Sequence, residues 1–249
     1  HMALPSLLPL GTFHLVYFGV MKPYWTWQGR DVWQVPPPPR ARYYRRTSSH
    51  FLSCGFITLM TMASLGWFSS RAPIVTDIFV LGRLVEHPRD VWFGLLPREW
   101  TTLGSLALGA AAYVVMVAAD LGYSRRCLAR GAPHMYYSTP QTRRDRVVWV
   151  GFSVLAGVTE ELTWRGVQPE LIAQLAGTLW PAVIICAATF GFGHIRNGRP
   201  FTVIAGLFAL GFHGLTLVTG SLYVAMIVHV AVNVTVGLRA GTWAARSAG

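Results

Sequence analysis

The sequence predicts an all-α fold, a polytopic integral membrane bundle of about seven transmembrane helices. Hydrophobic residues make up 53% of the 249 residues and charged residues only 12%, and the mean hydropathy is +0.41. This composition is typical of a protein whose surroundings are the lipid bilayer. Apolar runs long enough to cross a bilayer recur along the chain, at about Leu4–Val20, Phe51–Ser69, Thr101–Leu121, Val147–Leu171, Thr178–His194, Phe201–Val218 and Leu222–Leu238.

The formal net charge of +11 does not indicate nucleic-acid binding, because the arginines lie in short segments between apolar runs. Lys22–His50 and Gly122–Arg146 each contain six basic residues and one acidic residue, whereas Ser70–Trp100 contains four of each. The positive-inside rule therefore predicts an outside N-terminus and a cytoplasmic C-terminus. We interpret the arginine bias, with Lys22 as the single lysine, as genomic composition rather than function, and it favours a bacterial inner membrane.

The N-terminal half shows no recognisable chemistry. The first apolar run lacks a basic leader and a cleavage site, so we expect a retained helix. Pro36–Pro39 predicts a stiff connector, and Ile74–Val85 predicts a segment along the outer interface. No disulfide is expected from the three cysteines, which are predicted to be small hydrophobes in apolar helices (Cys54, Cys186) and in a cytoplasmic loop (Cys127).

Two adjacent glutamates and an arginine interrupt the fourth apolar run. An ionised side chain costs several kcal/mol at membrane depth, so such residues persist where they are paired or used. Glu161 and Arg165 share a helix face and can neutralise each other, whereas Glu160 is rotated by about 100° from that pair. The spacing predicts that Glu161 holds Arg165 while Glu160 remains available as a base. A structural ionic network of all three residues is the alternative.

The histidine that ends the fifth apolar run is predicted to lie at the depth of Glu160. If the fourth and fifth helices turn near Gly177, Glu160 lies 17 residues before the turn and His194 lies 17 residues after it. Equal rise along both arms then brings the two side chains to one level. Phe190 precedes His194 by four positions and shares its face. A satisfied core histidine is the alternative.

The seventh apolar run supplies His229 and Asn233, four positions apart on one face. An interhelical hydrogen-bond pair is the alternative interpretation. Three polar residues predict that the C-terminal part of the fourth helix reaches the outer interface or bends at Pro169, namely Gln168, Glu170 and Gln174. Either arrangement would bring His229 to the depth of His194. His213 pairs with no polar group four positions away and is predicted to be structural, with a contribution to the site as the alternative.

Glu160, two histidines and an asparagine in a membrane cavity would form a hydrolytic set, with a base for water and donors for a developing oxyanion. Peptide hydrolysis is therefore the leading reaction class. The sequence contains no HExxH motif, no GxGD motif and no Ser-His pair at a recognisable nucleophile turn. These absences leave a glutamate-centred interpretation.

The polar motifs resemble those of the CPBP family, the CAAX-protease and bacteriocin-processing proteins that are also called Abi proteins. Glu160–Arg165 matches EExxxR, Phe190–His194 matches FxxxH and His229–Asn233 matches HxxxN, in the family's order. The resemblance covers about Val147–Leu238. We divide the chain into N-terminal transmembrane helices and loops at 3–145, a catalytic core at 146–240 and a C-terminal tail at 241–249.

The resemblance implies an intramembrane endopeptidase with a cavity that faces the cytoplasm. Within it, Glu160 would be the general base that activates water, with His194 as its assistant. His229 and Asn233 would stabilise the tetrahedral intermediate. Three further residues would support the site, namely Glu161, Arg165 and Phe190.

Metal dependence, substrate and activity each have an alternative. Glu160, His194 and His229 could supply three ligands to zinc or another divalent metal, but no cofactor is favoured because Asn233 fits a hydrogen-bond donor better than a metal ligand. The expected partner is a membrane-anchored protein or peptide substrate, cut near its anchored end, with no nucleic acid. A non-enzymatic immunity or partner-binding protein of the same fold is the alternative function. The sequence does not predict an oligomeric state.

Overall fold

The computed structural model describes residues 9–28, 40–64, 102–219 and 222–247, and these residues form helices without strands, as the sequence predicts. The connector and the interfacial segment predicted before residue 100 lie outside the described residues. In chain order the helices are α1 (Leu10–Val16), the π-helix η2 (Tyr17–Met21), α2 (Lys22–Gln28), α3 (Arg40–Ser64), α6 (Thr102–Ala129), α7 (Pro133–Ser138), α8 (Arg143–Glu161), the π-helix η4 (Leu162–Val167), α9 (Gln168–Ala176), α10 (Leu179–Phe192), the 3-10 helix η5 (Ile195–Asn197), α11 (Arg199–Thr219) and α12 (Leu222–Ser247).

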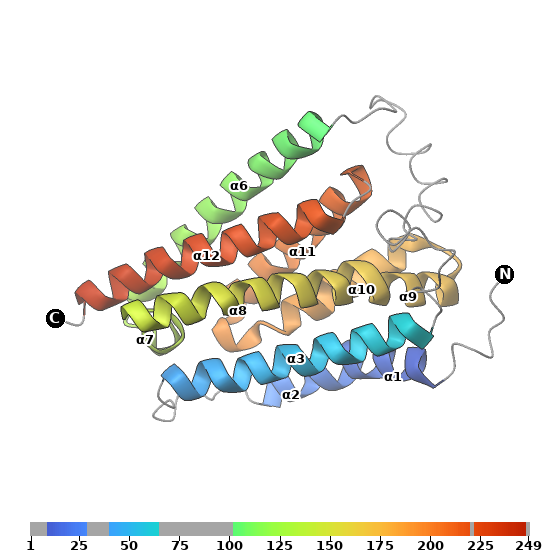
Figure 1. The fold of residues 1–249 in the computed structure, drawn as a ribbon, viewed down its shortest axis with the longest axis horizontal. Coiled ribbons are helices and arrows are strands. Elements are labelled where there is room, and N and C mark those ends of the chain that lie inside the picture. The colour runs from blue at the N-terminus through green and yellow to red at the C-terminus, as the bar shows by residue number, and fades with distance from the viewer. Residues whose placement is uncertain (1–8, 29–39, 65–101, 220–221, 248–249) are drawn as a thin grey trace.

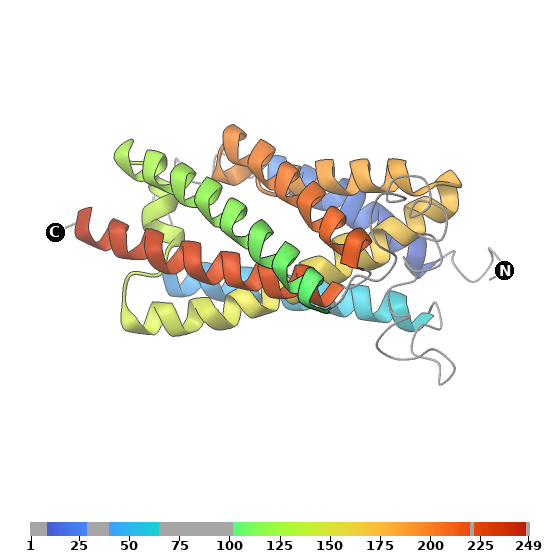
Figure 2. The ribbon, with the colours of Figure 1, turned by 90° about the horizontal axis from the view of Figure 1, so that it is seen from above.

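The long helices run side by side along the long axis of the bundle (Figure 1). Helix α8 lies between α3 and α12 and contacts both of them. Figure 2 shows α6 crossing obliquely over α12, which it also contacts. After α9 the chain turns back into α10 at Gly177, which adopts a left-handed φ of 69° that favours glycine. The predicted turn near Gly177 is confirmed, and α10 then packs against α11.

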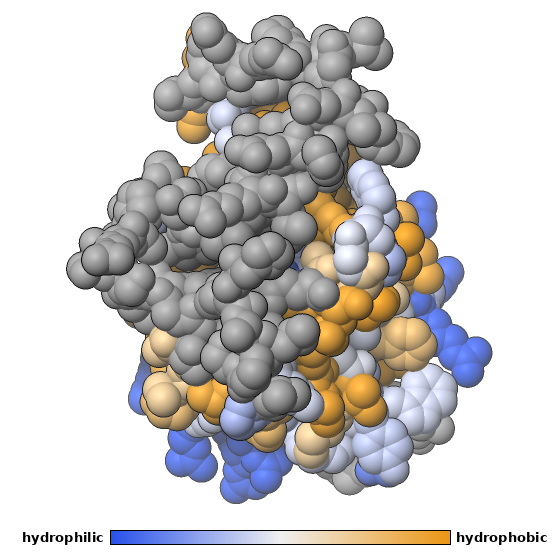
Figure 3. Space-filling model, turned by 90° about the vertical axis from the view of Figure 1, so that its right-hand side faces the viewer, coloured by the Kyte–Doolittle hydropathy of each residue, from blue (hydrophilic) through white to orange (hydrophobic). Residues whose placement is uncertain are grey.

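Three of the described helices are long and apolar enough to cross a membrane, at Leu103–Ala129, Arg199–Thr219 and Leu222–Ser247. Helix α10 is apolar but has only 14 residues. Many large apolar side chains of the described helices are exposed, such as Val115 of α6 at 67%. Figure 3 shows apolar side chains exposed on the part of one face that is not drawn in grey. An apolar exterior of this kind suits lipid contact, so the chain is an integral membrane protein. The number of seven spans stays a prediction.

Several helices extend beyond the apolar runs that predict them. Helix α3 begins at Arg40 instead of Phe51, and α6 continues past Leu121 to Ala129. The prediction of a loop around Cys127 is wrong, because this residue lies in the last turn of α6, where it packs against Met135 and Ala240. Hydropathy marks the lipid-facing part of a helix, whereas backbone hydrogen bonds continue into its polar ends. All three cysteines are free and buried.

A capping box fixes the beginning of α8, before its apolar part. The Thr142 side chain accepts a hydrogen bond from the Asp145 N–H, and the Asp145 carboxylate accepts one from the Thr142 N–H, both at 3.1 Å. Arg40 from α3 lies 3.0 Å from the same carboxylate. Burial alone would raise the pKa of Asp145, but hydrogen bonds from Thr142, Arg40 and Gln141 lower it overall. The ionised Asp145 thus ties α3 to α8.

The helical winding changes directly after the two glutamates. Helix α8 ends at Glu161, and the π-helix η4 leads without a break into α9. Pro169 in the first turn of α9 lacks an N–H and cannot complete the α-helical hydrogen bond to the Arg165 carbonyl, so a local change of winding is expected just before it. The chain therefore changes from π-helical to α-helical winding just before Pro169 and stays helical through α9. Glu170, in α9, is buried within the protein.

Helices α8 and α12 approach closely at Gly157, three residues before Glu160. A Cβ atom at Gly157 would lie 2.6 Å from Cγ2 of Val230 and 3.2 Å from its backbone nitrogen. These separations are shorter than ordinary van der Waals contact, so a side chain here would push the two helices apart. The glycine therefore sets the distance between the helices that carry the polar residues.

Gly157→Ala is expected to destabilise the protein by about 1–3 kcal/mol through this overpacking. The measurement is thermal unfolding in detergent, followed by intrinsic fluorescence. Gly151→Ala is the matched control, because a Cβ at Gly151 of the same helix meets nothing within 4 Å. Equal unfolding temperatures for the two variants would contradict the close approach.

Candidate active site

One cavity of about 430 Å³ brings together the four residues that the sequence predicts to be catalytic. Glu160 comes from α8, His194 follows α10, and His229 and Asn233 come from α12. The cavity wall also includes residues of α2, α3, α6 and α7. Three motifs that are widely separated in the sequence therefore line one cavity. The shared depth was predicted for Glu160 and His194, and the structure adds His229 and Asn233 at the same cavity.

The adjacent glutamates have different surroundings. Glu161 is fully buried, and its Oε1 atom lies 3.0 Å from Nη1 of Arg165, which is also fully buried. Glu160 lines the cavity, whereas neither Glu161 nor Arg165 does. The predicted pairing of Glu161 with Arg165 is confirmed. A rotation of one residue along α8 thus separates a buried ion pair from a carboxyl group at the cavity.

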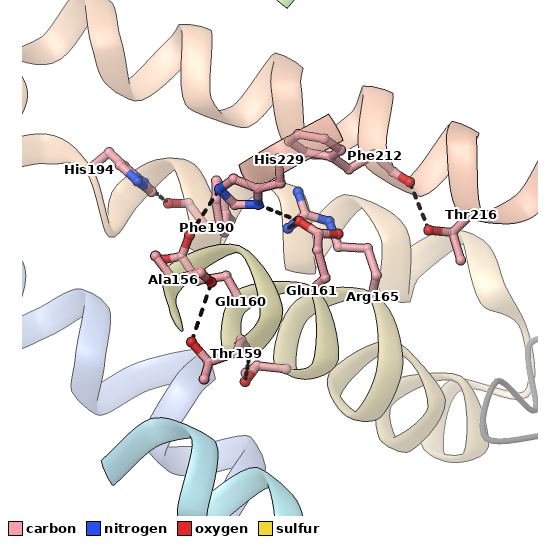
Figure 4. Close-up of polar contacts among 11 residues, drawn as sticks. Ala156, Thr159, Glu160, Glu161, Arg165, Phe190, His194, Phe212, Thr216 and His229 are labelled. Atoms are coloured by element: carbon pink, nitrogen blue, oxygen red, sulfur yellow. Dashed lines mark hydrogen bonds and ion pairs between the residues drawn. The ribbon is translucent and has the colours of Figure 1, made fainter. Parts of the chain in front are cut away.

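His229 lies between the two carboxyl groups (Figure 4). Its Nδ1–H donates a hydrogen bond of 2.7 Å to Oε1 of Glu161, the same oxygen that accepts from Arg165. Its Nε2 atom lies 3.5 Å from Oε2 of Glu160. An ionised carboxylate can only accept hydrogen bonds, so the proton of the neutral His229 ring lies on Nδ1, which faces Glu161. Glu161 therefore orients His229 as well as holding Arg165, a role that the sequence did not reveal.

His194 is oriented by the last turn of the helix that precedes it, α10. Nδ1 lies 2.9 Å from the carbonyl oxygen of Phe190, one turn earlier, so Nδ1 carries the proton and Nε2 is left as an acceptor. The imidazole ring also lies 4.7 Å from the Phe190 ring, centroid to centroid. The predicted shared face of Phe190 and His194 is confirmed. His194 lines the same cavity as Glu160, with its unprotonated nitrogen unused by the Phe190 contact.

Asn233 offers a hydrogen-bonding group that the surrounding helices leave unused. Its backbone carbonyl accepts a 2.9 Å hydrogen bond from the indole N–H of Trp149, which fixes α12 against α8 at this level. Its side-chain amide has no hydrogen-bond partner within the described part of the chain, and the residue lines the cavity. A carbonyl group placed in the cavity could accept a hydrogen bond from this amide.

Aromatic rings cover the buried charges. The guanidinium carbon of Arg165 lies 4.6 Å from the ring centroid of Phe190 and 5.0 Å from that of Phe212. The Phe212 ring also stacks on the His229 ring, with 5.0 Å between the ring centroids and an interplanar angle of 16°. Cation–π contacts of this kind stabilise a desolvated guanidinium. Phe212, on α11, belongs to no predicted motif. Its position directly before His213 is the single feature of the sequence that could have drawn attention to it.

His213 is buried on α11 and does not line the cavity. Its Nε2 atom is buried without a hydrogen-bond partner within the described ranges. The residue thus lies apart from the four cavity residues.

The metal alternative requires three ligands around one point. Within the described residues, no group of three or more His, Cys, Asp and Glu side chains is arranged to hold a metal ion. Glu160 and His229 lie close together, but His194 does not complete a three-ligand set with them. The residues as they lie therefore do not fit a zinc site, and we derive no step through a metal.

Fold and site together define a helical membrane protein with a buried, charged polar centre beside a cavity. Residues 143–235 match the family model described as "Type II CAAX prenyl endopeptidase Rce1-like". This match confirms the resemblance to the CPBP family over the segment that carries all three motifs, and it supports a protease. No curated protein and no solved structure matches the chain.

Arg165→Ala is expected to cost about 3–5 kcal/mol of stability, because it leaves the buried Glu161 carboxylate without its cation. The yield of monodisperse protein in detergent should fall sharply, whereas Arg246→Ala, which removes an exposed arginine, should behave as the parent. The double variant Glu161→Gln with Arg165→Met removes both charges and should recover much of the yield. A stable Arg165→Ala protein, or a double variant no better than the single one, would contradict the buried pair.

Proposed function

We propose that the protein is an intramembrane endopeptidase that cuts a membrane-anchored protein or peptide near its anchored end. The observation that carries this proposal is the position of Glu160, a carboxyl group at a cavity within 3.5 Å of a histidine that Glu161 already orients. The match of residues 143–235 to an endopeptidase family supports the same reaction class. Glu160, His194, His229 and Asn233 are the proposed catalytic residues.

Glu160 is the proposed general base. A water molecule beside its carboxylate would lose a proton to Glu160 as the oxygen attacks the carbonyl carbon of the scissile peptide bond. The C–N bond then breaks, and the leaving nitrogen takes the proton back from Glu160. The unprotonated Nε2 of His194 can accept a hydrogen bond from the same water and so assist its alignment. One proton therefore moves from water to the amine, and the base is regenerated.

His229 and Asn233 are the proposed donors to the oxyanion of the tetrahedral intermediate. The side-chain amide of Asn233 lines the cavity and has no hydrogen-bond partner among the residues that the structure describes. His229 can donate from Nε2 when it is protonated, and Glu161 on the Nδ1 side stabilises the resulting imidazolium.

Access from the cytoplasm is part of the proposal. The cavity wall includes Lys22, Arg46 and Arg196. Two of these lie in the basic segment that the positive-inside rule places in the cytoplasm, and Arg196 falls on the same side by the same rule. Water and a polar peptide segment would enter here while the anchor of the substrate stays in the bilayer, with the C-terminus of the protease also cytoplasmic.

An immunity or partner-binding protein without turnover is the second candidate. It would keep the Glu161–Arg165 pair, which stabilises the bundle. It would have no use for a carboxyl group and an unpaired amide held at a cavity, since both are costly in a membrane interior. The cavity position of Glu160 and Asn233 therefore favours the enzyme.

Glu160→Gln and Glu160→Ala are expected to fold and to lose cleavage, by at least about 100-fold, because neither can accept a proton from water. The assay is hydrolysis of a membrane-anchored peptide in liposomes, followed by mass spectrometry of the products. Glu170→Gln removes a buried carboxyl group from the same helical stretch but away from the cavity and should retain parental turnover. Parental turnover by Glu160→Gln would show that the base lies elsewhere.

Chelator treatment is expected to leave the activity unchanged, because the proposed steps use no metal. Protein purified without chelators is assayed before and after incubation with 1,10-phenanthroline or EDTA, and its metal content is measured by elemental analysis. Glu160→Gln serves as the inactive reference in both measurements. Stoichiometric zinc whose removal and return track the activity would contradict the glutamate-activated water.

A further inference from the structure

The single lysine of the chain lies at the wall of the active-site cavity. Lys22 begins α2 directly after the π-helix η2, and its ammonium group lies over two aromatic rings. The Nζ atom is 5.7 Å from the ring centroid of Phe18 and 5.5 Å from that of Trp164. Both rings are buried, and they lie edge to face at 5.8 Å. These contacts hold the charge in one place.

Lys22 has no carboxylate partner within the ranges that the structure describes. This distinguishes it from Arg40 and Arg165, each of which is paired with an acid. Among the described residues, the cavity wall carries two more cations, Arg46 and Arg196, and two acidic residues, Asp120 and the proposed base Glu160. A partly enclosed wall with unpaired positive charge attracts an anion from the ligand.

The ammonium group is connected to the catalytic residues by packed rings. Trp164, which carries the Lys22 contact, lies edge to face with Phe190 at 6.0 Å. The carbonyl of Phe190 in turn holds His194. The steps along this path are 5.5 Å from Nζ to the Trp164 ring, 6.0 Å to the Phe190 ring and 4.7 Å to the His194 ring. The ammonium group therefore lies at most about 16 Å from His194, which an extended peptide covers in about five residues. A group bound at Lys22 would thus lie a few residues from the scissile bond.

We propose that Lys22 determines specificity by binding a carboxylate of the substrate peptide, either its terminal carboxylate or an Asp or Glu side chain. The proposal rests on the proposed endopeptidase function and adds the chemistry of the substrate to it. Lys22 lies outside residues 143–235, so this preference belongs to the N-terminal part of the chain and not to the matched segment. The aromatic contacts position the ammonium, and its unpaired charge selects the anion.

The test uses three peptides that bear the same lipid anchor and differ only in the carboxylate that they carry near the C-terminal end. The first ends in a free carboxylate, the second ends in an amide, and the third ends in an amide but carries one Glu in place of Gln near its end. KM and kcat are measured for the parent, Lys22→Met, Lys22→Arg and Arg42→Met. Arg42 is an exposed basic residue of α3 that does not line the cavity, so its variant controls for lost surface charge.

Lys22→Met should raise KM by about tenfold for the peptide that the parent prefers and leave kcat within about twofold. Lys22→Arg should retain the parental preference for that peptide, because it keeps the positive charge, and Arg42→Met should match the parent. Preference for the free carboxylate identifies the chain terminus as the ligand, and preference for the Glu peptide identifies a side chain. The proposal is overturned if the parent treats all three peptides alike, or if Lys22→Met keeps the parental preference.

A binding measurement separates this proposal from the proposed function. Fluorescent forms of the three peptides are titrated into Glu160→Gln and into Glu160→Gln with Lys22→Met, and anisotropy gives Kd. The first variant should bind one carboxylate peptide about tenfold more tightly than the neutral peptide, and the second should not. If the parent cuts no peptide but this difference appears, the hydrolase proposal fails while the carboxylate site stands. Equal Kd values overturn the site whether or not cleavage occurs.

Discussion

The buried ion pair between Glu161 and Arg165 is the interaction on which the rest of the site depends. Two charges without solvent are tolerated where each compensates the other. Glu161 accepts from both Arg165 and His229 through one oxygen, and two aromatic rings cover the guanidinium. Because these groups come from α8, η4, α10, α11 and α12, the pair fixes the relative positions of the helices that form the cavity.

Because Glu161 binds Arg165 and His229, the adjacent Glu160 is the carboxyl group that faces the cavity. Adjacent residues of a helix are rotated by about 100°, so the side chain of Glu160 cannot share the buried position and lines the cavity instead. Close packing at Gly157 brings α12 near enough for His229 to face both glutamates. Neighbouring carboxyl groups with different surroundings can take different roles, one structural and one proposed to be chemical.

The sequence predicted the parts of the site that depend on spacing within a helix. The Glu161–Arg165 pair and the Phe190–His194 contact both follow from a separation of four residues. The turn at Gly177 followed from the lengths of two apolar runs, and it placed His194 at the cavity that Glu160 lines.

Contacts between distant helices could not be predicted in this way. The bond from His229 to Glu161 joins residues 68 positions apart and requires the mutual rotation of two helices. Phe212 belongs to no motif, although it stacks on His229. Lys22 carries no signal in a single sequence beyond its rarity, since its place at the cavity depends on Trp164 from another helix. Helix ends such as Arg40 of α3 were missed because hydropathy reports lipid contact and not backbone hydrogen bonding.

The most direct measurement of the central claim is an experimental structure in a lipid nanodisc at a resolution that shows ordered water. We predict one Glu161 oxygen within hydrogen-bond distance of both Arg165 and His229, and a Glu160 carboxyl group in contact with cavity water. Exchanged roles, with Arg165 bound to Glu160 and Glu161 at the cavity, would contradict the account. A Glu160 side chain that points into the acyl chains would contradict it as well.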